Sequence, residues 1–221
     1  MSRLEHVRDA IDRVTAGPVT RADRPLWAAT RTRDDVGELT AQWLEGRIAS
    51  QPGCSGTVDV DEDDAPGLTD TLVLLNRSGF VTDQSQAGCD TTNEYGHWRQ
   101  HAAVSGYASR ATCVWLRDRL TGTRYRLTAS VLDWRGRPER LVGRPVTVTW
   151  RDNRPWTTFG RPLRRRDIRF LYGDCGREAI DALCAAVQIT IYDPRPARND
   201  LWSFLRGEFQ LNRNLTEGQP S

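Results

Sequence analysis

The sequence predicts an α+β fold, in which a single domain contains a mixed β-sheet with helices packed on it. Apolar residues at spacings of three and four, which are typical of helices, are interspersed with short alternating segments, which are typical of strands. These segments do not follow the strict strand–helix–strand repetition of a parallel α/β protein. The 221 residues, of which 38% are apolar and eight are tryptophan, are enough to bury one sizeable core.

The N-terminal segment predicts a short amphipathic helix followed by a linker. One apolar stripe within residues 2–15 consists of Leu4, Val7, Ile11 and Val14. Because two heptads are too short for a stable coiled coil, this helix must dock on its own domain or on a partner, and a homodimer is one expectation. The TRADRP segment at 20–25 is typical of a linker.

The chain therefore divides into three parts. Residues 1–24 hold the amphipathic helix and the linker, residues 25–209 hold the α+β domain, and residues 210–221 form a polar tail that we expect to fray.

Five segments of the domain have helical patterns. Residues 34–48 have two aspartates in the first turn and one apolar face. The next helix has Pro66 in its first turn and Gly79 just past its end. Its buried face consists of Leu68, Leu72 and Leu75. The other predicted helices are 109–120, 176–186 and 199–209.

Strand patterns lie between these helices. Residues 80–82 precede a loop that contains Gly88 and Gly96, and residues 97–104 alternate as the next strand. A hairpin is predicted within the PVTVTWRDNRPWTTF segment, because alternating residues flank a turn near Asp152. The remaining predicted strands are 124–132, 167–172 and 187–193.

The net charge of +2 is unevenly distributed. Residues 135–169 contain eleven arginines and three acidic residues, a local net charge of +8, whereas residues 59–64 read DVDEDD. The two segments could face each other or face water. Alternatively, the basic segment binds nucleic acid or an acidic protein partner, with aromatic residues nearby to stack bases. The arginines of this alternative are Arg161, Arg164, Arg165 and Arg166.

The cysteines and the hydropathy indicate a cytoplasmic protein with reduced thiols. The five cysteines are scattered without CxxC spacing, nothing at the start resembles a signal peptide, and no apolar run is long enough for a membrane span.

The usual signals of catalysis and metal binding are weak. No GxSxG, GxGxxG or Walker sequence is present. A metal cluster drawn from Cys89, Asp90, Glu94, His97 and His101 matches no closed zinc pattern, so we expect no metal and place the two histidines at a rim. Glu62 and Asp64 are a candidate acid–base pair, although such acidic runs are usually solvated loops.

One segment, GFVTDQSQAG at 79–88, carries several hydrogen-bonding side chains where a strand is expected to end. Thr82 would lie at the end of the strand, with Ser85 and Gln86 in the following loop. Such positions bind small ligands in many proteins, although the same groups could simply cap the strand end. The acidic loop before the preceding helix could supply Asp64 and Glu62 to a positively charged ligand.

Three motifs carry a resemblance to a known family. LNRSGFVTDQSQAG, HWRQHAAVSGYAS and the segment from DIRFLYGD to NDLW are similar, in order and spacing, to the C-terminal regulatory domain of eukaryotic methylenetetrahydrofolate reductase. The likeness covers about residues 36–205. The chain also resembles a family of small uncharacterised actinobacterial proteins that share ELTAQWLEGRIASQPG and VDVDEDDAPGLT.

The resemblance to the reductase domain implies an α+β regulatory domain without a catalytic barrel. It implies S-adenosylmethionine or S-adenosylhomocysteine as a ligand, with no required cofactor, and Thr82 and Ser85 as ligand-binding residues. Gln86 and Gln100 match motif positions whose role is either structural or close to that ligand. The chain departs from the family where Ala65 replaces a threonine and where Ala87 replaces a proline. The expected function is a non-catalytic small-ligand-binding or regulatory domain, and the alternative is an interaction protein with an arginine-rich face.

Overall fold

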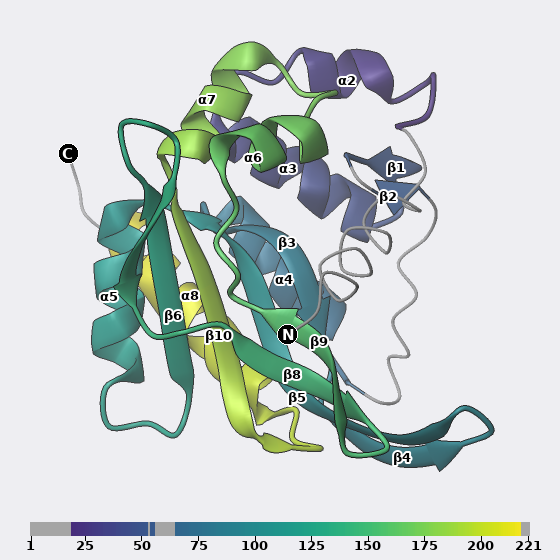
Figure 1. Ribbon diagram of the computed structural model, residues 1–221. Coiled ribbons are helices and arrows are strands. Elements are labelled where there is room, and N and C mark those ends of the chain that lie inside the picture. The colour runs from purple at the N-terminus through teal and green to yellow at the C-terminus, as the bar shows by residue number, and fades with distance from the viewer. Residues whose placement is uncertain (1–18, 53, 56–64, 218–221) are drawn as a thin grey trace.

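The computed structural model describes residues 19–52, 54–55 and 65–217 (Figure 1). The predicted helix at 2–15, with its proposed role in a homodimer, lies outside these residues, as do Glu62 and Asp64. The helices are α2 (Arg24–Ala28), α3 (Arg33–Leu44), α4 (Leu68–Arg77), α5 (Arg110–Leu120), α6 (Arg165–Leu171), α7 (Arg177–Ala185) and α8 (Asp200–Glu217). The strands are β1 (Ser50–Gln51), β2 (Cys54–Ser55), β3 (Val81–Gln86), β4 (Cys89–Asn93), β5 (Gly96–Ala108), β6 (Arg126–Leu132), β7 (Pro138–Val142), β8 (Val146–Arg151), β9 (Arg154–Phe159) and β10 (Val187–Pro196).

Eight of the strands form one curled sheet, which confirms the predicted α+β class. The strand order of this sheet is β7-β6-β10-β5-β8-β9. Strands β3 and β4 pair with the edge of β5 that faces away from β10 and β8. Where a mixed sheet was expected, every ladder between the described strands is antiparallel. Hairpins and long returns connect these strands, so no parallel crossover is needed.

The long strand β5 changes partners along its length. Residues 98–100 pair with β4 and β8, whereas residues 103–107 pair with β3 and β10. The β8–β9 hairpin therefore leaves the plane of the sheet and folds over one of its faces. Val148 and Phe159 of the hairpin pack there against Ala103.

Helices α4, α5 and α8 cover the other face of the sheet (Figure 1). Leu68, Leu72 and Leu75 are buried in α4 as predicted, and Gly79 follows the helix with a positive φ of 79°. The α8 residues on this face are Leu201, Trp202, Leu205 and Phe209. The spacing of three and four in both helices places these side chains on single stripes against β5 and β10.

A second core lies at one end of the sheet, where Figure 1 shows α2, α3, α6 and α7 together. Trp27, Val36 and Leu183 meet Tyr107 there. Tyr107, Ser105 and Ala103 alternate with the residues of β5 that face α4 and α8. The second core and the hairpin core consequently share one face of the sheet, with Ser105 between them.

One segment predicted as a strand forms a helix instead, because local hydrogen bonds and burial outweigh its alternating sequence pattern. Ile168, Phe170 and Tyr172 alternate, but residues 167–171 belong to α6 and Tyr172 directly follows it. The Asp167 carboxylate accepts a hydrogen bond from the Arg164 amide at 3.0 Å and starts this helix. Ile168 and Tyr172 are buried and Phe170 is 72% exposed, which is a helical burial pattern.

Residues on both sides of the predicted 25–209 domain are also ordered against it or continue its last helix. Within the TRADRP segment, expected as a linker, Asp23 is buried and accepts hydrogen bonds from Ser50 Oγ at 2.8 Å and from the Ala49 amide at 3.0 Å. This segment is therefore fastened to the domain and leads into α2. Residues 210–217, expected to fray, continue α8, because a polar sequence forms a helix when its outer face meets solvent.

Candidate functional site

The structure places Thr82 differently from the sequence-based expectation. Thr82 is 8% exposed and lies near the start of β3. Its hydroxyl accepts a hydrogen bond from Asn76 Nδ2 at 2.7 Å, and its amide donates to Asn76 Oδ1 at 3.0 Å. The side-chain oxygen of Thr82 is thus bound to a residue of α4, six positions earlier in the chain, and does not point into an open space.

Ser85 and Gln86 belong to β3, and the expectation that they lie in a loop was wrong. Both continue the ladder with β5 beyond a bulge, and Ser85 is exposed. The Gln86 side chain donates to the carbonyls of His101 and Val148 at 2.9 and 3.1 Å and accepts from Thr149 Oγ1 at 3.0 Å. Gln86 therefore attaches the β8–β9 hairpin to the main sheet.

Other residues of the motifs that carry the resemblance also hold the fold together. Asn199, at the start of α8, accepts from the Gly88 amide at 2.8 Å and donates to its carbonyl at 3.2 Å. Gln100 lies in β5 between β4 and β8, and its carbonyl accepts from the Ala197 amide at 3.1 Å. A side chain at Gly88 would place its Cβ 2.6 Å from the Arg198 carbonyl oxygen, so this contact requires glycine.

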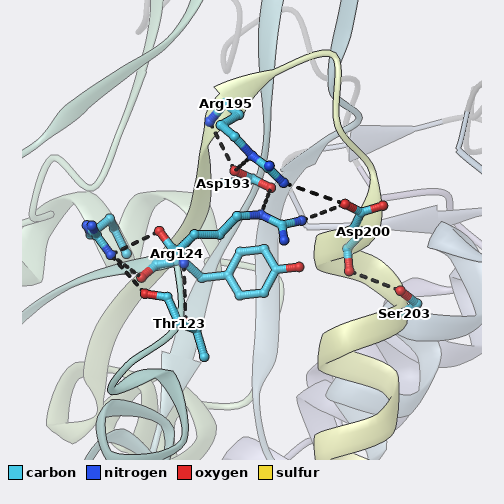
Figure 2. Close-up of polar contacts among 8 residues, drawn as sticks. Thr123, Arg124, Asp193, Arg195, Asp200 and Ser203 are labelled. Atoms are coloured by element: carbon cyan, nitrogen blue, oxygen red, sulfur yellow. Dashed lines mark hydrogen bonds and ion pairs between the residues drawn. The ribbon is translucent and has the colours of Figure 1, made fainter.

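The last of these motif residues, Asp193, is fully buried at the end of β10 (Figure 2). Its carboxylate accepts from Arg124 Nε at 2.8 Å and from the Arg195 amide at 3.0 Å. Arg124 also contacts Asp200 at 2.6 Å. These hydrogen bonds and ion pairs connect the segment just before β6 to the C-terminal part of β10 and to the first turn of α8. Their role is therefore structural.

A hollow lies on the sheet face between the second core and the hairpin core. Its floor comes from β3, β5, β6 and β10, and its walls from residues 140–145 and 158–163. Gln188 fixes one wall, since its side chain accepts from the Leu163 amide at 2.6 Å and donates to the Leu163 carbonyl at 2.8 Å. The hollow has a volume of about 30 Å³, enough for roughly two water molecules below its mouth.

The register of the strands places polar side chains next to one another on the floor of the hollow. Thr190 of β10 lies directly opposite Ser105 of β5 on one side and Thr128 of β6 on the other. In the next row, Gln188 lies between Tyr107 and Ser130. Register thus brings polar side chains from three strands onto one buried patch, where apolar residues would be usual.

Two of these hydroxyl groups have no partner within the described residues. Ser105 Oγ and Thr190 Oγ1 bond each other at 2.6 Å. Thr128 and Ser130 are each only 6% exposed and line the hollow, and their hydroxyl groups make no hydrogen bond to any group that the structure describes. Neither oxygen is fully enclosed, so both are available to water or to a ligand.

Two glycines shape the wall around Thr128. Gly143 and Gly160 have φ values of 70° and 75°, which favour glycine. A Cβ on Gly160 would lie 2.6 Å from Thr128 Oγ1, and one on Gly143 would lie 2.7 Å from Thr128 Cγ2. Any larger residue at either position would therefore press on the floor of the hollow.

The arginines of the basic segment do not form one free surface. Arg161 lines the hollow. Arg164 precedes α6, Arg165 lies 3.6 Å from Asp181, and Arg166 lies 3.4 Å from Asp167. Two of the four guanidinium groups are therefore paired with carboxylates.

The candidate metal residues are also separated. His97 Nε2 lies 2.7 Å from Asp90 Oδ1 on the β4–β5 hairpin. His101, expected at a rim, is buried beside Trp150, and this burial lowers the pKa of its imidazole. Across the described ranges, no three His, Cys, Asp or Glu side chains are grouped to hold a metal ion.

The sequence reasoning missed the hollow, although the sequence held a signal for it. Strand β10 is buried on both faces, yet Gln188 and Thr190 alternate with apolar Val187, Ile189 and Ile191. A strand covered on both faces is usually apolar throughout. Polar residues at every second position of such a strand indicate that one of the covered faces holds a polar cavity.

The structure is thus an α+β domain with a small polar hollow on one face of a curled antiparallel sheet. Residues 22–211 match the model of a family described as a domain of unknown function, DUF6919, and the chain belongs to that family. No curated protein matches the chain. In the part of the chain that the structure describes, every helix is too short or too polar to span a lipid bilayer.

Proposed function

We propose that this protein is a non-catalytic small-ligand-binding domain whose site is the hollow over β5, β10 and β6. The observation that carries the proposal is the pair of hydroxyls of Thr128 and Ser130, two largely buried residues, which line the hollow without a hydrogen-bond partner among the described residues. Both oxygens are open to water, and a ligand that displaces this water can bond them in its place. This site replaces the one expected at Thr82 and Ser85.

S-adenosylmethionine and S-adenosylhomocysteine are the first ligands to test, because the resemblance to the reductase regulatory domain motivates them. The volume below the mouth admits only part of such a molecule, so most of an adenosyl ligand would lie at the mouth, between residues 140–145 and 158–163. We propose that its hydroxyl or amide groups reach down to Thr128 and Ser130.

The test is a thermal-shift screen with S-adenosylmethionine, S-adenosylhomocysteine and simple nucleotides. A ligand at a hundred times its dissociation constant adds about 2.7 kcal/mol of stability. For a chain of this length the midpoint should rise by roughly 5–10 °C. If the shift is caused by binding in the hollow, Thr128→Val combined with Ser130→Ala should abolish it.

The unliganded protein provides the control for this experiment. Because neither hydroxyl bonds a described residue, the double variant should melt at or above the wild-type temperature. Ser85→Ala changes an exposed hydroxyl on the same sheet and should leave the ligand shift intact. The proposal fails if no compound moves the midpoint, or if Ser85→Ala removes the shift and the double variant does not.

A second candidate function, an interaction protein with a basic face, rests on two exposed aromatic side chains. Trp134 is 84% exposed and Phe170 is 72% exposed. The turn that holds Trp134 is joined to α6, because the Gly136 carbonyl accepts from the Arg165 amide at 3.1 Å. Exposed aromatic rings beside arginines suit a nucleic acid or an acidic protein. Binding to arbitrary DNA that weakens steeply with salt would favour this function, and no binding at low salt would exclude DNA as the partner.

A further inference from the structure

The charged residues around the hollow are mostly basic. Among the lining residues, the formal charges are those of Arg140, Arg144, Arg161 and Asp83, three positive and one negative. The floor beneath them consists mostly of hydroxyls, amides and a phenol, with Asp83 of β3 as its charged residue. The mouth of the hollow therefore has a net positive charge, which attracts anions.

Two of the three arginines have side chains without a partner among the described residues. Neither the Arg140 nor the Arg144 guanidinium group makes a hydrogen bond, an ion pair or a ring contact with any described residue. Neighbouring arginines are engaged: Arg137 lies 3.1 Å from Asp133, and Arg165 lies 3.6 Å from Asp181. The guanidinium groups of Arg140 and Arg144 are thus free to bind a ligand at the mouth of the hollow.

The two arginines without a side-chain partner lie close in the fold to Thr128 and Ser130, whose hydroxyls also lack a partner. Arg140 of β7 is the direct register partner of Ser130 in β6. Arg144 follows Gly143, whose backbone is packed against Thr128. Both arginines therefore line the same hollow as the two hydroxyls and come from backbone next to them.

We propose that the ligand of this site carries an oxyanion, a phosphate or a carboxylate, which Arg140 and Arg144 hold at the mouth while Thr128 and Ser130 bond its polar body. The inference rests on the proposed ligand-binding function and adds the charge of the ligand to it. A guanidinium group offers a planar fork of N–H donors that matches both oxyanions. A ligand with only a cationic sulfonium would meet the wrong charge at the mouth.

Three adenosine compounds that differ only at the 5′ position test the charge. Adenosine is neutral, adenosine 5′-monophosphate carries a 5′-phosphate, and in adenosine 5′-carboxylate a carboxylate replaces the 5′-hydroxymethyl group. Affinities are measured by titration calorimetry at constant ionic strength with the full chain. We expect at least one of the anionic probes to bind about tenfold or more tightly than adenosine, and the stronger of the two identifies the oxyanion.

Charge-removing variants then locate the effect. Arg140→Gln combined with Arg144→Gln should weaken the anionic probe about tenfold or more and leave adenosine unchanged. Arg110→Gln on α5 is the matched control, because this exposed arginine lies away from the hollow and should change neither affinity. Both variants alter surface side chains, so their melting temperatures should stay close to that of the wild type.

The outcomes separate the two proposals. If adenosine binds as tightly as both anions and the arginine variants change nothing, the oxyanion is excluded while the ligand-binding site stands. If the probes bind but Thr128→Val with Ser130→Ala has no effect, both the site and the inference are overturned. If none of the three probes binds at millimolar concentration, the inference is overturned, and only a response to another compound of the thermal-shift screen would keep the ligand-binding proposal.

Discussion

Asn76 holds Thr82 by two hydrogen bonds, one to its backbone amide at 3.0 Å and one to its hydroxyl at 2.7 Å. A third bond, from Asn76 Nδ2 to the Leu72 carbonyl at 2.8 Å, keeps the Asn76 side chain in place on α4. The pair joins the end of a helix to the start of the next strand across the tight turn at Gly79. Thr82 therefore has a structural role that explains its place in the motif.

We predict that Thr82→Val destabilises the protein without affecting ligand binding. The valine leaves the buried Asn76 amide short of one acceptor, which costs about 1–3 kcal/mol. Urea unfolding measures this loss, with Ser85→Ala as a control that should cost almost nothing because Ser85 is exposed. If the Thr82→Val protein melts like the wild type but no longer responds to the ligand, the binding site lies at Thr82 and not in the hollow.

Substituting Gly160 should damage the hollow directly. Gly160→Ala and Gly122→Ala both place alanine at a φ near +75°, since the two glycines have φ values of 75° and 78°. Each should lose about 1–2 kcal/mol from backbone strain. Only Gly160→Ala also forces a methyl group against Thr128, because nothing lies within 4 Å of a Cβ at Gly122.

We expect the Gly160→Ala protein to lose about 1–3 kcal/mol more than the Gly122→Ala protein, from overpacking, and to lose its response to ligands. Chemical denaturation compares the two stabilities, and the thermal-shift screen compares the responses. If the Gly160→Ala and Gly122→Ala proteins are equally stable, Gly160 does not pack closely against Thr128.

The buried Asp23 predicts a specific loss of stability in acid. Burial alone would raise the pKa of this carboxyl, but hydrogen bonds from Ser50, Thr20 and the Ala49 amide outweigh burial and lower the pKa below its ordinary value of 3.8. A carboxyl whose pKa is lowered by folding stabilises the protein above its unfolded pKa, and this contribution disappears as the pH falls through the folded value.

Asp23→Asn should therefore be less stable than the wild type at pH 7, by about 1–3 kcal/mol for the lost charged hydrogen bonds. The difference should shrink as the pH falls below about 3.8. Urea unfolding of both proteins across this range measures the trend, with Asp118→Asn at an exposed position as the control. A difference that stays constant with pH would mean that the Asp23 pKa is not changed by folding.

Much of the fold was predictable because its elements carry strong periodic signals. The buried leucines of α4, the helix at Arg177–Ala185 and the hairpin around Asp152 and Asn153 are all present as predicted. The positive φ values of 51° and 61° at those two turn residues match the preference of Asp and Asn for such turns. Local patterns decide these elements, so the sequence is sufficient for them.

The candidate site was less accessible to sequence reasoning because it depends on register between distant strands. Ser105, Thr128 and Thr190 lie in three different strands, and no single segment shows that the three side chains meet. Only the pairing of β10 with both β5 and β6 brings them side by side. Sequence motifs pointed instead to Thr82 and Gln86, whose hydrogen-bonding groups serve the packing of strands and helices.

The position of β10 between β5 and β6 also sets the order in which the molecule can be completed. The neighbours β5 and β6 share no ladder with each other, so the sheet is continuous only when residues 187–196 lie between them. A chain that lacks this strand would have two separate half-sheets with open inner edges, which are prone to pairing with other chains. We therefore expect the sheet to close only after the chain has been synthesised as far as residue 196.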